Sequence, residues 1–96
     1  MPNEVAKSVL LINGPRFYSQ TDEDYFFARI QSISEIEKVT GVVRDLELIV
    51  RRPMDKESLR DLVALMRRYN LDRSPLKPLC DEQQDEYLRN AWTAHG

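Results

Sequence analysis

LELIVRRPMDKESLRDLVALMRRYN, residues 46–70, changes its hydrophobic period halfway along, which indicates a strand followed by a helix. Successive side chains of a strand point to opposite faces, so the alternation in LELIVRR predicts a sheet with one covered face. After Pro53, apolar residues recur at intervals of three and four, which predicts an amphipathic helix over about residues 55–69. On the strand, Leu46, Leu48 and Val50 are expected on one face, and Glu47, Ile49 and Arg51 on the other.

Both ends of this helix carry recognisable signals. Asp55 can cap the free amides of the first turn, and Met54 and Leu59 occupy the positions of a hydrophobic staple. Asn70 suits the left-handed residue that closes a helix, after which Leu71 can fold back on Met66 or a neighbour. The residues expected on the buried face are Leu59, Leu62, Val63, Met66 and Tyr69.

The first half of the chain predicts a strand, a helix and a second strand before LELIVRR. KSVLLIN, residues 7–13, reads as a strand that ends in a turn, with RFYSQ as its continuation or return. Thr21 is a good N-cap ahead of three carboxylates, so the first helix is expected to begin there. Residues 34–52 predict two strands that meet at Gly41 or at the Val43–Asp45 bend. The first helix is expected to bury Phe26, Phe27, Ile30 and Ile33.

The C-terminal third predicts a short turn and a last helix. Ser74 and Pro75 can start a turn, and Pro78 argues against a long helix in this region. Asp81, with Gln84 three residues later, has the spacing of a helix start. The residues expected to point inward from this last helix are Tyr87, Leu88, Ala91 and Trp92.

These elements predict one α+β domain that spans residues 1–96. Their order is β-α-β-β-α-α, and each helix has one apolar stripe that needs a surface to cover. A small, mainly antiparallel sheet with one apolar face supplies that surface. The expected architecture is therefore a two-layer sandwich in which about three helices cover the sheet.

Composition narrows the classes of function. The chain of 96 residues lacks both a long apolar run and the pattern of a signal peptide, so we expect a cytoplasmic protein that does not enter membranes. Cys80 is the only cysteine and His95 the only histidine. They are too few for a transition-metal site and make no convincing catalytic pair. No glycine-rich phosphate-binding motif occurs, so we expect neither a cofactor nor enzymatic activity.

Charge is distributed unevenly along the chain. The formal net charge is −2, which makes nucleic-acid binding an unfavoured function. Residues 51–77 hold eight Lys and Arg against four Asp and Glu, whereas residues 17–50 hold three against seven and residues 78–96 hold one against four. Because the basic middle lies between acidic neighbours, we expect these segments to face one another in the fold.

Two groups of side chains are candidate contacts for a partner. Arginines of the basic middle suit carboxylates or phosphates, although the same residues also suit a solvated or internally paired helix face. The acids and aromatics of TDEDYFF suit a basic protein partner if the aromatic rings are exposed, although helix capping and core packing are the simpler explanation. The candidate contacts are Arg60, Arg67, Arg68 and Arg73 in the first group and Asp22, Asp24 and Tyr25 in the second.

RRYNLD (67–72), LKPL (76–79) and DEQQDEYLRNAW (81–92) together resemble a class of small bacterial α/β proteins. These have an amphipathic helix that ends in Arg-Tyr, a short Asp-Leu turn and a terminal helix rich in aromatic residues. The resemblance covers the last half of the chain and rests on packing residues. It implies a small binding partner, including immunity proteins that neutralise a toxin, and transfers no functional residue.

The sequence therefore supports two hypotheses of different classes. The first is a non-enzymatic module that binds another protein through a charged and aromatic surface, with a toxin-neutralising immunity protein as its narrower form. A homodimer is compatible with it. The alternative is a small-ligand or anion-binding protein, or an enzyme, that uses the arginine-rich segment 51–73.

Overall fold

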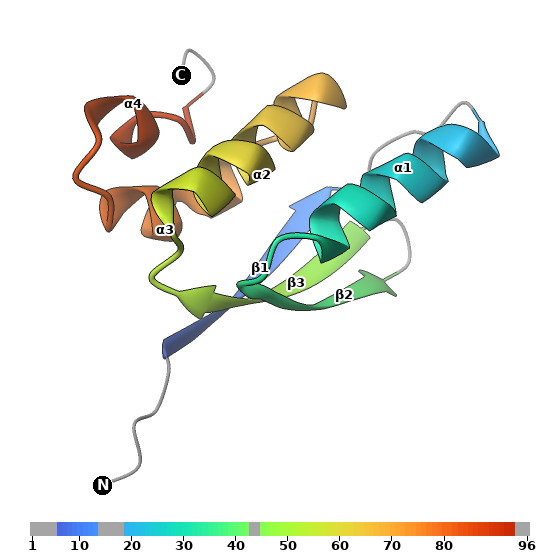
Figure 1. Ribbon diagram of the computed structural model, residues 1–96, viewed down its shortest axis with the longest axis horizontal. Helices are drawn as coiled ribbons and strands as arrows, with labels where there is room; N and C mark the ends of the chain where they lie inside the picture. The colour runs from blue at the N-terminus through green and yellow to red at the C-terminus, as the bar shows by residue number, and fades with distance from the viewer. Residues whose placement is uncertain (1–5, 14–18, 43–44, 94–96) are drawn as a thin grey trace, which may run out of the picture.

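The computed structural model describes residues 6–13, 19–42 and 45–93. Its sheet has three antiparallel strands in the order β1-β3-β2, namely β1 (Ala6–Asn13), β2 (Ile36–Val42) and β3 (Asp45–Arg52). The described helices lie on one side of this sheet (Figure 1). They are α1 (Gln20–Gln31), α2 (Lys56–Arg68), the 3-10 turn η1 (Ser74–Leu76), α3 (Lys77–Asp81) and α4 (Glu86–Arg89). The predicted two-layer α+β architecture is confirmed.

The central strand β3 has the predicted alternation. Leu46, Leu48 and Val50 are buried at 6%, 0% and 0% exposure. Leu10 of β1 lies opposite Leu48, so the apolar face continues onto the neighbouring strand. Gly41 belongs to β2 and pairs with Leu46, so the chain does not reverse there. The alternative bend falls on residues 43–44, which lie outside the described residues, and β3 begins directly after them.

Helix α2 begins and ends as the sequence predicts. The Asp55 carboxylate accepts a hydrogen bond from the Glu57 N–H at 3.1 Å. Asn70 has a φ of 55°, and this left-handed residue lets the Leu71 N–H donate to the Met66 carbonyl at 2.8 Å. The predicted face is buried, with Tyr69 packed against its edge, and Leu65 joins it.

The start of α1 was predicted two residues too late. Ser19 is the N-cap, and its hydroxyl oxygen accepts a hydrogen bond from the Asp22 N–H at 3.1 Å. Thr21 therefore lies inside the first turn, because the earlier serine already satisfies that amide. Of the possible strand RFYSQ, residues 16–18 lie outside the described residues, and Gln20 is helical. The apolar face is as predicted, with Phe26, Ile30 and Ile33 buried and Phe27 half-buried.

The start of the last helix was also wrong. Asp81 ends the five-residue helix α3, which contains Pro78 in its first turn, where a missing N–H is tolerated. Asp85 caps α4 instead, because its carboxylate accepts a hydrogen bond from the Leu88 N–H at 3.2 Å. This later start turns Tyr87 outward, at 49% exposure, while Leu88 stays buried. Of the other residues expected to point inward, Ala91 is buried and Trp92 packs partly buried against the core.

The α2 face should account for a large share of the stability. Leu62 is fully buried in the core, so Leu62→Ala is expected to lower the free energy of unfolding by about 2 to 5 kcal/mol. Leu59→Ala should act in the same direction. Urea unfolding measures both, with Ala64→Gln on the exposed face of α2 as a control that should change stability by less than about 0.5 kcal/mol. A Leu62→Ala midpoint equal to wild type would show that this face does not pack in the core.

Candidate protein-contact surface

The basic middle of the chain faces its acidic neighbours, as its charge pattern predicts. Arg52 Nε lies 3.0 Å from a Glu82 carboxylate oxygen and joins the end of β3 to the segment after α3. On the N-terminal side, Arg51 Nε lies 3.3 Å from a Glu37 oxygen, and Lys7 bonds the same carboxylate at 2.8 Å. Much of the positive charge in residues 51–77 is therefore balanced within the fold.

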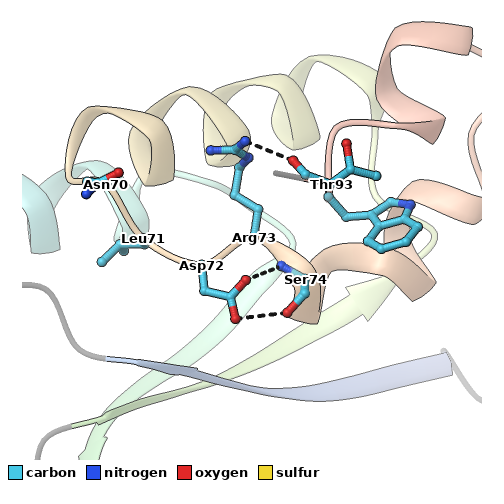
Figure 2. A pocket seen from close by; sticks show the side chains of 7 residues that line it. Asn70, Leu71, Asp72, Arg73, Ser74 and Thr93 are labelled. Carbon is cyan, nitrogen blue, oxygen red and sulfur yellow. Dashed lines mark hydrogen bonds between the residues drawn. The ribbon is translucent and has the colours of Figure 1, made fainter. Parts of the chain in front are cut away.

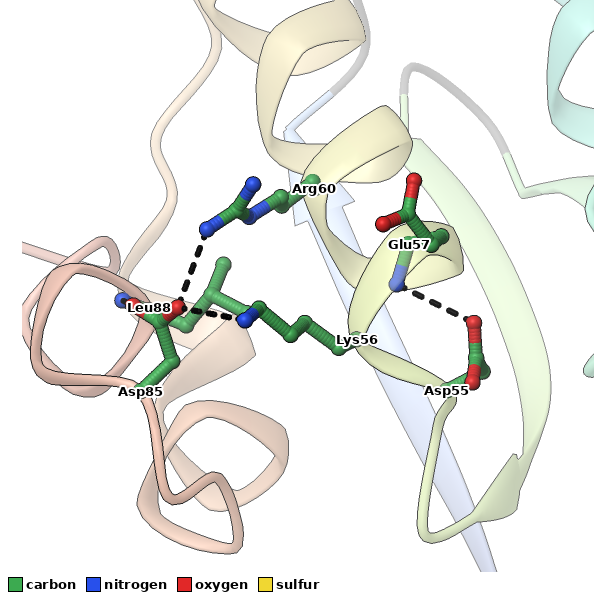
Figure 3. Close-up of polar contacts among 6 residues, drawn as sticks. All are labelled: Asp55, Lys56, Glu57, Arg60, Asp85 and Leu88. Carbon is green, nitrogen blue, oxygen red and sulfur yellow. Dashed lines mark hydrogen bonds and ion pairs between the residues drawn. The ribbon is translucent and has the colours of Figure 1, made fainter.

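Asp85 is the centre of an ion-pair group with two cations of α2 (Figure 3). Lys56 Nζ lies 3.2 Å and an Arg60 guanidinium nitrogen 2.9 Å from the same Asp85 oxygen, whose side chain is only 16% exposed. Hydrogen bonds from Lys56, from the Leu88 N–H and from Arg60, in that order of importance, lower the pKa of Asp85 to about 2, although desolvation opposes them. Arg60, predicted as a partner contact, thus connects α2 to α4.

Arg73 is likewise used inside the fold (Figure 2). Its Nε donates to the Ala91 carbonyl and a terminal nitrogen donates to the Thr93 carbonyl, both at 3.0 Å. It lines a surface hollow of about 550 Å³, whose other charged group is Asp72. That carboxylate accepts hydrogen bonds from the N–H and hydroxyl of Ser74, which lower its pKa. Both charged groups of the hollow are therefore engaged within the fold, Arg73 with residues 91 and 93 and Asp72 within its own turn.

Arg67 and Arg68 are placed differently, at the exposed end of α2. The Arg68 guanidinium carbon lies 5.1 Å from the ring centre of Tyr25 in α1. The Arg67 guanidinium carbon lies 5.8 Å from the ring centre of Tyr87 in α4. The two tyrosines are 42% and 49% exposed, so each ring is covered on one side and open to solvent elsewhere. These four residues, Tyr25, Arg67, Arg68 and Tyr87, are called the Tyr–Arg surface below.

A small groove borders this surface between α1 and α2. It has a volume of about 190 Å³, and its lining includes the buried Leu65 and the exposed Ala64 of α2. Arg29 of α1 and Arg68 of α2 line it together with Asp61 and Tyr25. Guanidinium groups on both helices can donate hydrogen bonds to a carboxylate that enters such a groove.

The acidic candidates lie at the beginning of α1. Asp22 is one helical turn before Tyr25 and shares its side of the helix, whereas Asp24 is rotated away from it. Asp24 accepts a hydrogen bond from Gln20 at 2.9 Å, and the Asp22 main-chain carbonyl accepts one from the Tyr69 hydroxyl at 3.3 Å. The structure thus brings Tyr25 to Arg68 and leaves the two carboxylates exposed at the helix end.

Sequence reasoning missed two residues of this region. Tyr87 was placed in the core because Asp81 was taken as the helix cap. With Asp85 as the cap, the spacing of Leu88 and Ala91 defines the buried side and leaves Tyr87 outside, a signal present in DEYLRNA. Arg29 was not predicted because the α2 side of its groove is formed by residues 61–68, more than thirty positions later in the chain.

Other chemical groups of the described residues have structural roles. Burial is the main cause that raises the pKa of the Cys80 thiol to about 11, so the thiol stays protonated at neutral pH. Burial opposes ionisation of Glu35, but hydrogen bonds from the Asp55 N–H and from Ser58 and Ser34 outweigh it and lower its pKa. In residues 6–13, 19–42 and 45–93, no three His, Cys, Asp or Glu residues could hold a metal ion together.

Every helix of the described segments is too short or too polar to cross a bilayer. Comparisons of the chain with protein-family models, curated proteins and solved structures found no match. The resemblance of residues 67–92 to small bacterial α/β proteins accordingly stays a prediction from the sequence.

Acid should weaken the Asp85 group in a defined pH range. A carboxylate with a lowered pKa stabilises the fold above its ordinary pKa of about 3.8, and that stabilisation is lost as the pH falls towards about 2. Carbon NMR of the side-chain carboxyl measures this pKa directly. Lys56→Gln should raise it, while Asp61→Asn, which removes a charge elsewhere on α2, should leave it as in wild type. A pKa near 3.8 in the wild-type protein would contradict the ion-pair geometry.

Proposed function

We propose that this domain is a non-enzymatic, cytoplasmic protein-binding module that contacts its partner through the Tyr–Arg surface. One observation carries the proposal: two exposed tyrosines flank α2, and an arginine of α2 lies over each ring. Tyrosine and arginine are the side chains that most often dominate binding energy at protein interfaces.

Stacking on a ring prepares each guanidinium for binding. An arginine that is held over an aromatic face loses less rotamer freedom when it meets a partner, and its edge N–H groups stay available to carboxylates. With Arg29 lining the adjacent groove, the positively charged groups outnumber the single Asp61 carboxylate there. The partner that fits this chemistry is a protein with an acidic patch.

The immunity-type hypothesis is narrower and asks for the opposite charge. A protein that masks a basic toxin needs exposed carboxylates, and Asp22 and Asp24 are the predicted candidates for that role. Asp85 and Glu82 are already engaged with basic residues of the chain itself. The Tyr–Arg surface is therefore the stronger basis for binding, and the immunity-type version stays the secondary proposal.

The alternative hypothesis, a small-ligand or anion site in segment 51–73, has fewer groups to use. Arg51, Arg52, Arg60 and Arg73 each bond to other parts of the chain. Arg67 and Arg68 are the arginines of the segment whose contacts are limited to exposed rings. The shifted carboxylates Glu35, Asp72 and Asp85 are likewise explained by hydrogen bonds and ion pairs within the fold.

Replacing Arg67 and Arg68 together by glutamine separates folding from binding. The double variant should change the free energy of unfolding by less than about 1 kcal/mol, because exposed cation–π and ion pairs contribute little. Partner capture should fall sharply and mainly through a slower association rate, and the wild-type rate should fall as salt is raised. A photo-reactive amino acid at the exposed position 64 identifies the partner in source cells, and the isolated partner then gives the rates.

The matched control is Lys7→Gln with Lys38→Gln. These lysines belong to the sheet, away from the helices, and their replacement removes the same two charges. This variant should bind the isolated partner as wild type does when the chain is kept below about 1 μM, so that binding reports on single copies of the chain. Wild-type association by the folded Arg67/Arg68 variant at low salt would remove the Tyr–Arg surface from the function.

A further inference from the structure

The sheet has a second face, which the described helices leave open (Figure 1). Side chains on this face alternate with the buried ones along β1 and β3. Val9 and Leu11 of β1 are 64% and 56% exposed, the highest values among the large apolar side chains of the described residues. Val9 lies opposite Ile49 of β3, which is half-buried. Three apolar side chains thus form a patch on the β1 and β3 part of the open face.

Charges of both signs surround this patch. At one end, the Glu37 carboxylate bonds Lys7 at 2.8 Å and lies 3.3 Å from Arg51. On the other flanks, Lys38 lies opposite Ile49, and Glu47 lies opposite Leu11. The open face therefore combines three cations and two carboxylates around the apolar patch.

We propose that a second copy of this chain covers the open face, so that two sheets pack face to face around a two-fold axis. Such an interface places a surface against itself, which requires that the surface be complementary to itself. An apolar patch that is surrounded by charges of both signs can be complementary to itself, because each cation can meet a carboxylate of the second copy. A face whose charges all had one sign would repel its own copy. Arg67 and Arg68 of the Tyr–Arg surface, together with the adjacent Arg29, would repel a second copy in this way. The net charge of −2 also leaves little repulsion between whole copies.

The size of the face sets the expected strength of the dimer. Strands of seven to eight residues, at about 3.3 Å per residue and about 4.8 Å between strands, give a face of roughly 25 Å by 14 Å. The area of this face is smaller than the roughly 800 Å² that each partner buries in a standard stable interface. The dimer should therefore be weak, with monomer and dimer exchanging at concentrations of about 10 μM to 1 mM.

Sedimentation equilibrium over this concentration range tests the proposal. The wild-type chain should show a reversible monomer–dimer equilibrium. Val9→Thr with Leu11→Thr places threonine, a β-branched residue that suits strands, at two exposed positions. Folding should therefore persist, while dimerisation should weaken at least about tenfold. Circular dichroism confirms the fold of the variant. Arg67→Gln with Arg68→Gln, on the helical side, is the matched control and should dimerise as wild type does.

Two opposite charge changes test whether the face meets its own copy. Lys7→Glu with Lys38→Glu leaves one cation and four carboxylates on the face, a net charge of −3, and Glu47→Lys leaves four cations and one carboxylate, a net charge of +3. Each variant alone should dimerise less than wild type because its face repels itself. An equimolar mixture of the two should dimerise more than either alone, because the acidic face of one then meets the basic face of the other.

Three results would overturn the proposal. A wild-type chain that stays monomeric up to about 1 mM leaves the face to another occupant. Dimerisation unchanged by the Val9/Leu11 variant places the interface elsewhere. Association that grows beyond the dimer indicates pairing along the exposed edge of β1 instead of closed packing of two faces.

Discussion

The packing of α1 and α2 on one face of β3 is the contact on which the rest of the structure depends. β3 is the central strand, and its buried residues Leu46, Leu48 and Val50 meet the buried face of the helices. The chain passes from β3 into α2 within three residues, so strand and helix are fixed to each other at once. With the described helices all on one side, two surfaces are left over: the outer side of the helices and the open face of the sheet.

Ion pairs within the fold determine which basic side chains stay available on these surfaces. The basic middle is held between acidic segments by Arg52 with Glu82, by Arg60 and Lys56 with Asp85, and by Arg51 with Glu37. These pairs close the C-terminal helices onto α2 and secure the sheet edge. Since exposed pairs of this kind contribute little individually, their main effect is to fix where the short helices lie. The smaller group of arginines that stack on tyrosines is what the proposed partner would contact.

Periodic and local signals made much of this fold predictable. The α2 face, the Asp55 cap and the left-handed Asn70 each follow from residues within a few positions of one another. The starts of α1 and α4 were less predictable, because Ser19 competes with Thr21 and Asp85 competes with Asp81 for the same role. Each pair offers similar capping chemistry, and only packing of the following turn selects between them.

The candidate site was harder to predict than the fold, because exposure and pairing depend on contacts between distant segments. Arg60, Arg67, Arg68 and Arg73 look alike in the sequence, yet two bond inside the fold and two lie over exposed rings. No pattern within residues 60–73 distinguishes them. The distinction comes from Tyr25, Asp85, Tyr87 and the carbonyls of residues 91 and 93, which the tertiary fold brings to α2 and to the turn after it.

The two proposed surfaces are compatible because they lie on opposite layers of the sandwich. The described helices lie on one side of the sheet (Figure 1). Packing of two copies through their sheets would therefore leave both helical layers outermost, and the proposed dimer would present two Tyr–Arg surfaces pointing away from each other. A partner with two acidic patches, or one that is itself a dimer, then binds with an effective concentration that a monomer cannot supply. A weak sheet-to-sheet contact can thus strengthen partner binding without adding any contact to it, and binding of such a partner stabilises the dimer in return.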